Sequence, residues 1–141
     1  MKKTRILMLL AGVALFASCK KDEEQAPADV AISGTWNKVS EYRTITQSGR
    51  ITKDTVFYPA GSHTWTFDLE AGKIYRLKDT QADTLFYKLI EENKKIVTAV
   101  DGDFIFELDT LPVLQLDKYY LKTEGHYTTP FTMDVISNFA R

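Results

Sequence analysis

The strongest constraint on the fold of this chain is an alternation of apolar and polar residues in short runs. The clearest run is Thr64–Leu69, in which Trp65, Phe67 and Leu69 share one face and polar residues share the other. Alternation with a period of two residues is typical of a β-strand that has one buried face. Runs rich in Val, Ile, Thr, Tyr and Phe recur from Val30 to the end of the chain.

Turn-forming residues divide this part of the chain into about nine short strands in sequential order. The predicted strands cover residues 35–46, 50–58, 64–69, 73–78, 84–91, 95–100, 104–109, 114–122 and 127–139. Turns are expected at Gln47–Gly49, Pro59–Gly61, Glu70–Gly72, Glu92–Asn93, Asp101–Gly102 and Glu124–Gly125. A change of phase near Lys118 indicates a bulge or a bend, and residues 134–141 fit a final strand or a short helix. The fold class is therefore all-β.

Composition limits the partners of the chain. Three of the 18 basic residues, and none of the 19 acidic ones, lie in residues 1–18, so the rest of the chain is mildly acidic. Nucleic-acid binding depends on clustered Lys and Arg, and the sequence has no such cluster. We therefore expect no nucleic-acid partner.

The first 18 residues have the pattern of an export signal. Lys2, Lys3 and Arg5 precede twelve uncharged residues, Ile6–Ala17. That length matches the apolar region of a signal peptide. As a helix it is too short to cross a hydrocarbon core about 30 Å thick. The sequence predicts a signal peptide over residues 1–18.

The residues that end this segment, Ala17-Ser18-Cys19, resemble a bacterial lipoprotein lipobox. The resemblance implies thioether lipidation of Cys19, cleavage before it and acylation of the new N-terminus. Two or more acyl chains hold a protein stably on a membrane, whereas one does so only marginally. The alternative is an ordinary signal peptide that ends near a free thiol. Because Cys19 is the only cysteine, no intramolecular disulfide and no cysteine-based metal site can form.

A charged run follows the cysteine: Lys20, Lys21, Asp22, Glu23 and Glu24. It resembles the export signal that sends lipoproteins of the Bacteroidota to the outer face of the outer membrane. The alternatives are a plain hydrophilic linker and an anchor on the periplasmic face. Residues 19–32 are thus expected to be a lipid-anchored linker.

The segment Ser33–Val39 resembles the Gly-x-Trp opening of lipocalin-like barrels, with Gly34 and Trp36 in the matching positions. In that family the glycine permits a close turn at the base of the barrel and the tryptophan plugs the closed end. The last residues, Asn138–Arg141, resemble a final strand that ends in aromatic-x-basic. The resemblance, to lipocalin-like lipoproteins of the Bacteroidota, implies an up-and-down antiparallel β-barrel of about eight to nine strands over residues 33–141.

An eight-stranded barrel is wide enough to be filled by side chains or to hold one small ligand. The aromatic residues expected to line such a pocket are Trp65, Phe67, Tyr75, Tyr87, Phe104, Phe106 and Phe131. A cavity behind Trp65 and Phe104 would indicate binding of a small, partly apolar ligand. If these rings instead fill the interior, the barrel is a structural or protein-interaction module of the cell envelope.

The sequence contains no pattern that indicates catalysis, a cofactor or a metal. His63 and His126, the only histidines, lie in predicted loops and lack the spacing of metal ligands. No Gly-x-Ser-x-Gly motif is present. Two aspartate pairs lack the ligand spacing of a calcium loop and fit turns better: Asp79/Asp83 and Asp101/Asp103. We expect a protein that is not an enzyme.

Replacing Cys19 by alanine tests the lipid anchor. Cells grown with a radioactive fatty acid are expected to label the wild-type protein, whereas Cys19→Ala stays unlabelled and leaves the membrane fraction, because the thioether and the acyl chains are lost together. Equal labelling of the two forms would refute lipidation at this residue.

Overall fold

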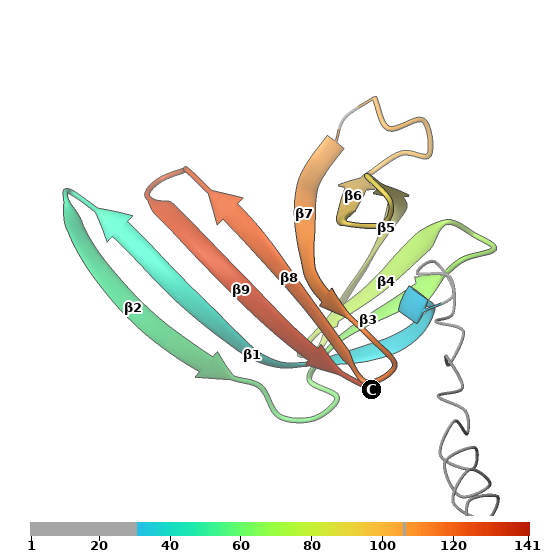
Figure 1. Cartoon of the computed structure of the whole chain (residues 1–141), viewed down its shortest axis with the longest axis horizontal. Helices are drawn as coiled ribbons and strands as arrows, with labels where there is room; N and C mark the ends of the chain where they lie inside the picture. Colours follow the sequence, from blue (N-terminus) through green and yellow to red (C-terminus); the bar gives the residue numbers. More distant parts are fainter. Residues whose placement is uncertain (1–30, 106) are drawn as a thin grey trace, which may run out of the picture.

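The computed structural model describes residues 31–105 and 107–141, and in them the chain forms nine antiparallel strands (Figure 1). The strands are β1 Gly34–Gln47, β2 Arg50–Phe57, β3 His63–Asp68, β4 Lys73–Lys78, β5 Gln81–Ile90, β6 Lys95–Ala99, β7 Glu107–Leu116, β8 Tyr120–Tyr127 and β9 Thr132–Ala140. The predicted signal peptide, Cys19, the charged run Lys20–Glu24 and Phe106 lie outside the described residues. Among the residues described, no helix has the length and apolar character needed to cross a membrane.

The strands form one antiparallel sheet that closes on itself. Strands β3 to β9 pair in sequential order, and β9 returns to pair with β1. The first residues of β1, Gly34–Asn37, pair with β3, and the later ones, Ser40–Gln47, pair with β2. This up-and-down topology is that of lipocalin-like barrels, and it confirms the predicted fold class. Strand β2 is an addition to the barrel on the outer side of β1.

The barrel is closed at one end and split at the other. Strand β1 meets β3 only over Gly34–Asn37, and β7 meets β8 only between Val113–Leu116 and Leu121–Thr123. Beyond these short pairings the strands diverge, as Figure 1 shows, with β2, β1, β9 and β8 on one side and β3 to β7 on the other. We call the two regions the closed end and the split end.

The closed end is held by Trp36, as the Gly-x-Trp resemblance implies. Gly34 has a φ of 96°, which favours glycine, and it starts β1. The Trp36 side chain is fully buried, and its Nε1 donates a 2.7 Å hydrogen bond to the carbonyl of Ile32. The guanidinium of Arg141 lies 4.2 Å above the Trp36 ring and donates to two backbone carbonyls of the segment before β1. The two ends of the barrel domain are thereby tied together.

The apolar core lies behind this plug. Its buried members come from eight of the strands, all except β2, and from the segment before β1: Ile32, Trp36, Phe67, Ile74, Tyr87, Ile96, Leu111, Leu121 and Phe139. Trp65, Leu89, Val113 and Leu116 pack against it while half-buried. Side chains therefore fill the interior of the closed end.

The predicted strand boundaries between residues 104 and 131 were wrong. The chain turns at Asp117, whose carboxylate accepts hydrogen bonds from the amides of Tyr119 and Tyr120 at 2.8 and 2.9 Å. The change of phase near Lys118 is therefore the turn between β7 and β8, not a bulge within one strand.

The turn expected at Glu124–Gly125 does not exist, because both residues lie inside β8. Gly125 serves a different purpose: a Cβ atom there would lie 2.9 Å from the Tyr127 hydroxyl, which packs over it. The last segment is a strand, β9, which begins only at Thr132.

Candidate functional site

The interior of the split end is charged. Within β1 the register against β9 shifts between Lys38 and Ser40, which inserts one extra residue. Because of this bulge, Lys38 and Glu41 share the inner face of the barrel although three positions separate them, and Val39 is left 40% exposed. The shift therefore places a cation and an anion above the buried Trp36 on the same strand.

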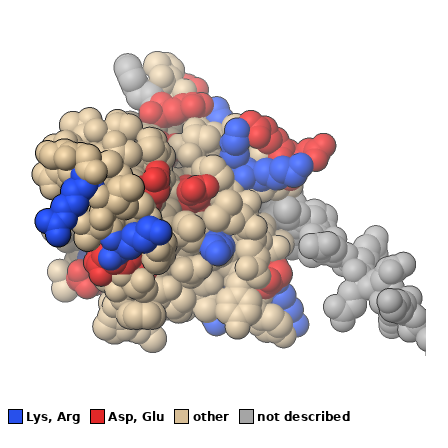
Figure 2. All heavy atoms as spheres, turned by 60° about the vertical axis from the view of Figure 1, so that its left-hand side comes forward, with Lys and Arg blue, Asp and Glu red and all other residues tan. Residues whose placement is uncertain are grey.

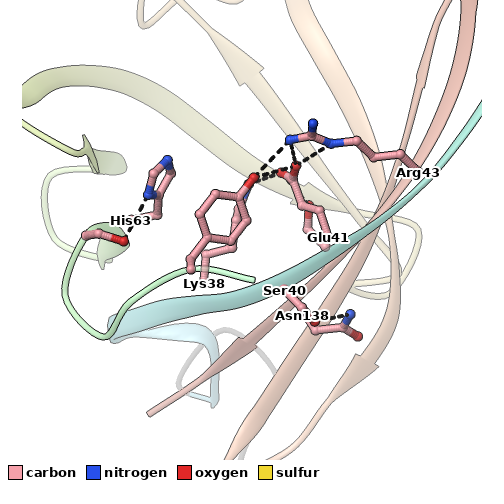
Figure 3. Close-up of polar contacts among 9 residues, drawn as sticks. Lys38, Ser40, Glu41, Arg43, His63 and Asn138 are labelled. Atoms are coloured by element: carbon pink, nitrogen blue, oxygen red, sulfur yellow. Dashed lines mark hydrogen bonds and ion pairs between the residues drawn. The ribbon is translucent and has the colours of Figure 1, made fainter. Parts of the chain in front are cut away.

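Glu41 is the centre of a cluster of polar contacts (Figure 3). The residue is 9% exposed, and its carboxylate accepts hydrogen bonds from Lys38, from the guanidinium of Arg43 at 2.6 and 3.1 Å, and from the Tyr58 hydroxyl at 2.7 Å. Ser137 of β9 donates a longer bond of 3.4 Å. Five donor atoms thus surround one buried charge.

These contacts determine how the cluster titrates. Burial by itself would raise the pKa of Glu41, but Lys38, Arg43 and Tyr58 outweigh it and lower the pKa to about 2. Burial and the hydrogen bond to Glu41 raise the pKa of Tyr58 to about 12. The carboxylate is therefore ionised, and the phenol protonated, at neutral pH.

Lys38 marks the boundary between the charged split end and the apolar core. Its Nζ atom lies 5.3 Å from the ring centre of Phe139, 5.7 Å from that of Trp65 and 5.8 Å from that of Tyr58. Trp65 and Phe139 pack against each other with their ring planes tilted by 47° and their ring centres 4.8 Å apart. An ammonium group near the faces of several rings is attracted by their quadrupoles.

A cleft of about 700 Å³ opens into this region from the split end. Its lining combines charged, polar and aromatic side chains: Lys38, His63, Trp65, Arg76, Leu77, Lys78, Gln81, Ala82, Asp83 and Tyr127. A neighbouring cavity of about 470 Å³ shares Lys38, His63 and Lys78 with it and extends to β2. The two cavities together run along the gap between β2 and β4.

The charges in the cleft have fixed positions. Arg76 and Asp83, opposite each other on β4 and β5, form two hydrogen bonds of 2.6 and 2.7 Å. The hydrogen bond from Arg76 lowers the pKa of Asp83. Lys78 forms no ion pair with a described residue. The cleft therefore has more positive than negative charge.

Of the aromatic residues predicted to line a pocket, Trp65 lies in the cleft. Phe67 and Tyr87 belong to the filled core, where their rings meet edge to face 5.2 Å apart. Tyr75 faces outward and is 42% exposed, because its register partners Thr66 and Thr84 lie on the outer face. Its strand directs Ile74 inward instead.

The remaining predicted pocket residues do not reach the cleft. Phe104 lies in the loop between β6 and β7, where the Lys88 ammonium is 4.4 Å from its ring centre. Phe131 precedes β9, is half-buried, and is not part of the cleft lining. Phe106 is outside the described residues.

The histidines occupy separate places. His63 is half-buried at the edge of the cleft, 3.1 Å from the Ser62 hydroxyl and 3.8 Å from Asp79. His126 pairs with Asp134 on the surface. In the described part of the chain, no three His, Cys, Asp or Glu side chains converge as metal ligands would.

The sequence reading missed the charged members of the site. Lys38, Glu41 and Arg76 carried no predicted role, and Asp83 was predicted to lie in a turn, whereas it lies in β5. A signal was present in β1, where Lys38 is two residues after Trp36 and so shares its face. The bulge that also brings Glu41 to this face has no local sequence signature.

Comparison with known proteins adds a likeness of fold. No protein-family model matches the chain, and no curated protein matches it. Among solved structures, a deswapped triple mutant of bovine odorant-binding protein is similar, with a TM-score of 0.45 and 15% sequence identity, over 79% of this chain and 74% of that one. A similarity at this level gives no information about a ligand, which has to be inferred from the residues of this chain.

The buried Glu41 predicts a loss of stability in acid. Its pKa in the folded protein, about 2, lies below the ordinary value of 4.5, so its contribution to stability is complete above pH 4.5 and is lost as the pH falls toward 2. The loss is expected to reach about 3 kcal/mol. Urea unfolding at a series of pH values measures it.

Glu41→Gln should flatten this part of the pH profile and lower stability at neutral pH by about 3 kcal/mol, because the largely buried Lys38 and the half-buried Arg43 lose their anion. Glu107→Gln is the matched control: the Lys88–Glu107 pair is exposed and is worth less than about 1 kcal/mol. An unchanged acid profile in Glu41→Gln would contradict the assignment.

Proposed function

We propose that this chain is a lipid-anchored outer-membrane protein, exposed on the cell surface, whose barrel binds a small, partly apolar molecule at the split end and performs no catalysis. The observation that supports ligand binding is the cleft of about 700 Å³ with Trp65 in its lining. Ligand sites in proteins have volumes of about 300–1,000 Å³. The proposed location on the cell surface rests on the resemblance of Ala17-Ser18-Cys19 to a lipobox and on the charged run that follows Cys19.

The chemistry of the lining supports an amphipathic ligand. Trp65 and Tyr127 offer ring surface, and the lining has three cations, Lys38, Arg76 and Lys78. Glu41 pairs with Lys38 and Asp83 pairs with Arg76, whereas Lys78 forms no ion pair with a described residue. Basic and acidic side chains are intermixed on the face that Figure 2 shows, without a broad area of one sign. The unpaired Lys78 lies in the lining of the cleft, and its charge favours a ligand whose polar end is anionic.

The state of the acidic groups supports a binding role over catalysis. A general base works best when its pKa lies near the working pH. Glu41 has a pKa of about 2 and already accepts hydrogen bonds from Lys38, Arg43 and Tyr58. The pKa of Asp83 is lowered by Arg76. Neither carboxylate is poised to take a proton from a substrate.

A second candidate is a structural or protein-interaction module of the cell envelope without a small ligand. The filled core of the closed end favours it, since Phe67 and Tyr87, two of the expected pocket residues, pack into each other. The two candidates differ in what the split end does.

Binding of anilinonaphthalene sulfonate, an amphipathic anion, tests the cleft. The dye is expected to bind the folded protein, and Lys78→Gln to raise its dissociation constant several-fold, because one unpaired cation of the lining is lost. Fluorescence titration measures this, and near-ultraviolet circular dichroism confirms that the protein stays folded.

Lys118→Gln is the matched control, since Lys118 lies in the β7–β8 turn at the closed end. Equal weakening by both substitutions, or no binding to the folded wild type, would count against a ligand site in the cleft.

Protease treatment of intact cells tests whether the protein lies on the cell surface. Wild-type protein is expected to be cleaved, whereas the combined change of Lys21, Asp22 and Glu23 to Ala leaves the protein anchored but hidden inside. If the altered protein is cleaved equally, the run is only a linker. If the wild type is protected, the protein faces the periplasm.

A further inference from the structure

Strand β2 has one unpaired edge. It pairs with β1 along its full length and with no other described strand. Seven of its eight residues are exposed. In Figure 1 it forms the outer border of the half-barrel made of β2, β1, β9 and β8.

The backbone groups at this edge can be identified. The amide of Tyr58 donates a 3.1 Å hydrogen bond to the carbonyl of Val39 in β1. In an antiparallel strand alternate residues direct their N–H and C=O groups to opposite edges. Residues 50, 52, 54 and 56 therefore face β1, and the groups of Ile51, Lys53, Thr55 and Phe57 lie at the free edge. The two-residue turn Ser48-Gly49 agrees with this phase, because such a turn is flanked by a hydrogen-bonded pair.

This edge lacks most of the devices that prevent strand pairing. Proteins protect edge strands by making them short or by adding proline or bulges. Strand β2 has eight residues without a proline, and its register with β1 is continuous. Ile51 and Phe57, on the outer face, are 64% and 77% exposed. The strand therefore presents both free backbone groups and exposed apolar side chains.

The order of the four edge residues of β2 favours antiparallel pairing with β2 of a second copy of the chain. If two β2 strands pair antiparallel about Asp54, Ile51 lies opposite Phe57 of the second copy, and Lys53 lies opposite Thr55. All four edge residues then hydrogen-bond. An aromatic residue opposite a β-branched one is a favourable cross-strand pair. We propose that two copies of this protein associate through their β2 strands in this register, which joins their half-barrels into one continuous sheet.

The neighbouring registers are poorer. A shift by one pair in one direction moves Phe57 opposite Gly49 of the turn, so the Ile51–Phe57 pair is lost, and it replaces the Asp54 pair at the axis by a pair of Lys53 side chains. A shift in the other direction leaves Ile51 unpaired. In the proposed register the two Asp54 carboxylates meet at the two-fold axis, and Arg43, the register partner of Asp54 in β1, flanks each of them on the inner face. The repulsion at the axis weakens the dimer without removing it.

Cysteine cross-linking in the full-length chain tests the register. In a Cys19→Ser background, Asp54→Cys places two thiols in a non-hydrogen-bonded pair at the axis, where the Cα atoms of such pairs, about 4.5 Å apart, lie within disulfide range. It is expected to form disulfide-linked dimers faster than Lys53→Cys and Thr55→Cys, which report the two shifted registers. Glu92→Cys, at a side chain that is 88% exposed, gives the collisional background.

Sedimentation equilibrium tests the association without a cross-link. The wild type is expected to show a monomer–dimer equilibrium. Thr55→Pro should shift it to monomer, because proline removes an edge N–H and leaves the pairing with β1 intact. Thr55→Val, which keeps the N–H, should dimerise, and Asp54→Asn should dimerise more tightly.

Two results would overturn the proposal. One is a wild type that stays monomeric at all concentrations while Asp54→Cys cross-links no faster than Glu92→Cys. The other is faster cross-linking at residue 53 or 55 than at residue 54, which would show a different pairing. Circular dichroism of Thr55→Pro distinguishes loss of dimer from loss of fold.

Discussion

The carboxylate of Glu41 is buried inside the barrel, and the shape of the split end follows from that one charge. Removing an ion from water costs several kcal/mol unless hydrogen bonds and opposite charges replace the solvent. Lys38, Arg43 and Tyr58 provide these contacts to Glu41. The donors themselves are charged or polar, so this part of the interior cannot close as an apolar core does. The strands diverge where the charges are.

The two ends of the barrel are therefore stabilised by different interactions. At the closed end, Trp36 and its neighbours are excluded from water and side chains fill the space. At the split end, charged groups line an open cleft, and Lys38 and Arg76 are held there by ion pairs with Glu41 and Asp83. Groups held in place by partners of their own need little reorganisation when a ligand arrives, which lowers the cost of binding. The boundary is the contact of Lys38 with the rings of Trp65 and Phe139.

Sequence reasoning recovered the fold because the fold depends on local patterns. The alternation around Trp65 and the Gly34-x-Trp36 opening both act over a few residues, and the structure confirms the strand and the plug. The errors arose where two local signals competed. Gly125 indicated a turn, but the turn in this region lies between β7 and β8, where the Asp117 carboxylate accepts a hydrogen bond from the Tyr119 amide. Gly125 lies inside β8, where the Tyr127 side chain packs close to it.

The site was harder to predict because it depends on phase and on distant partners. In β4, both Ile74 and Tyr75 offer an apolar face, and only the pairing of Ile74 with Phe67 decides which one turns inward. The bulge beside Val39 brings Glu41 to the inner face, and the Arg76–Asp83 pair joins two strands. Such features follow from the register of the whole sheet, which no single stretch of sequence determines.

The central claim is that the split end holds a small molecule in the living cell. Native mass spectrometry of the full-length protein, purified from its own host, tests this most directly. We expect a non-covalent small-molecule adduct beyond the mass of the processed chain, released when the protein unfolds. A chain that carries no such adduct, and instead retains only another protein, would contradict the claim.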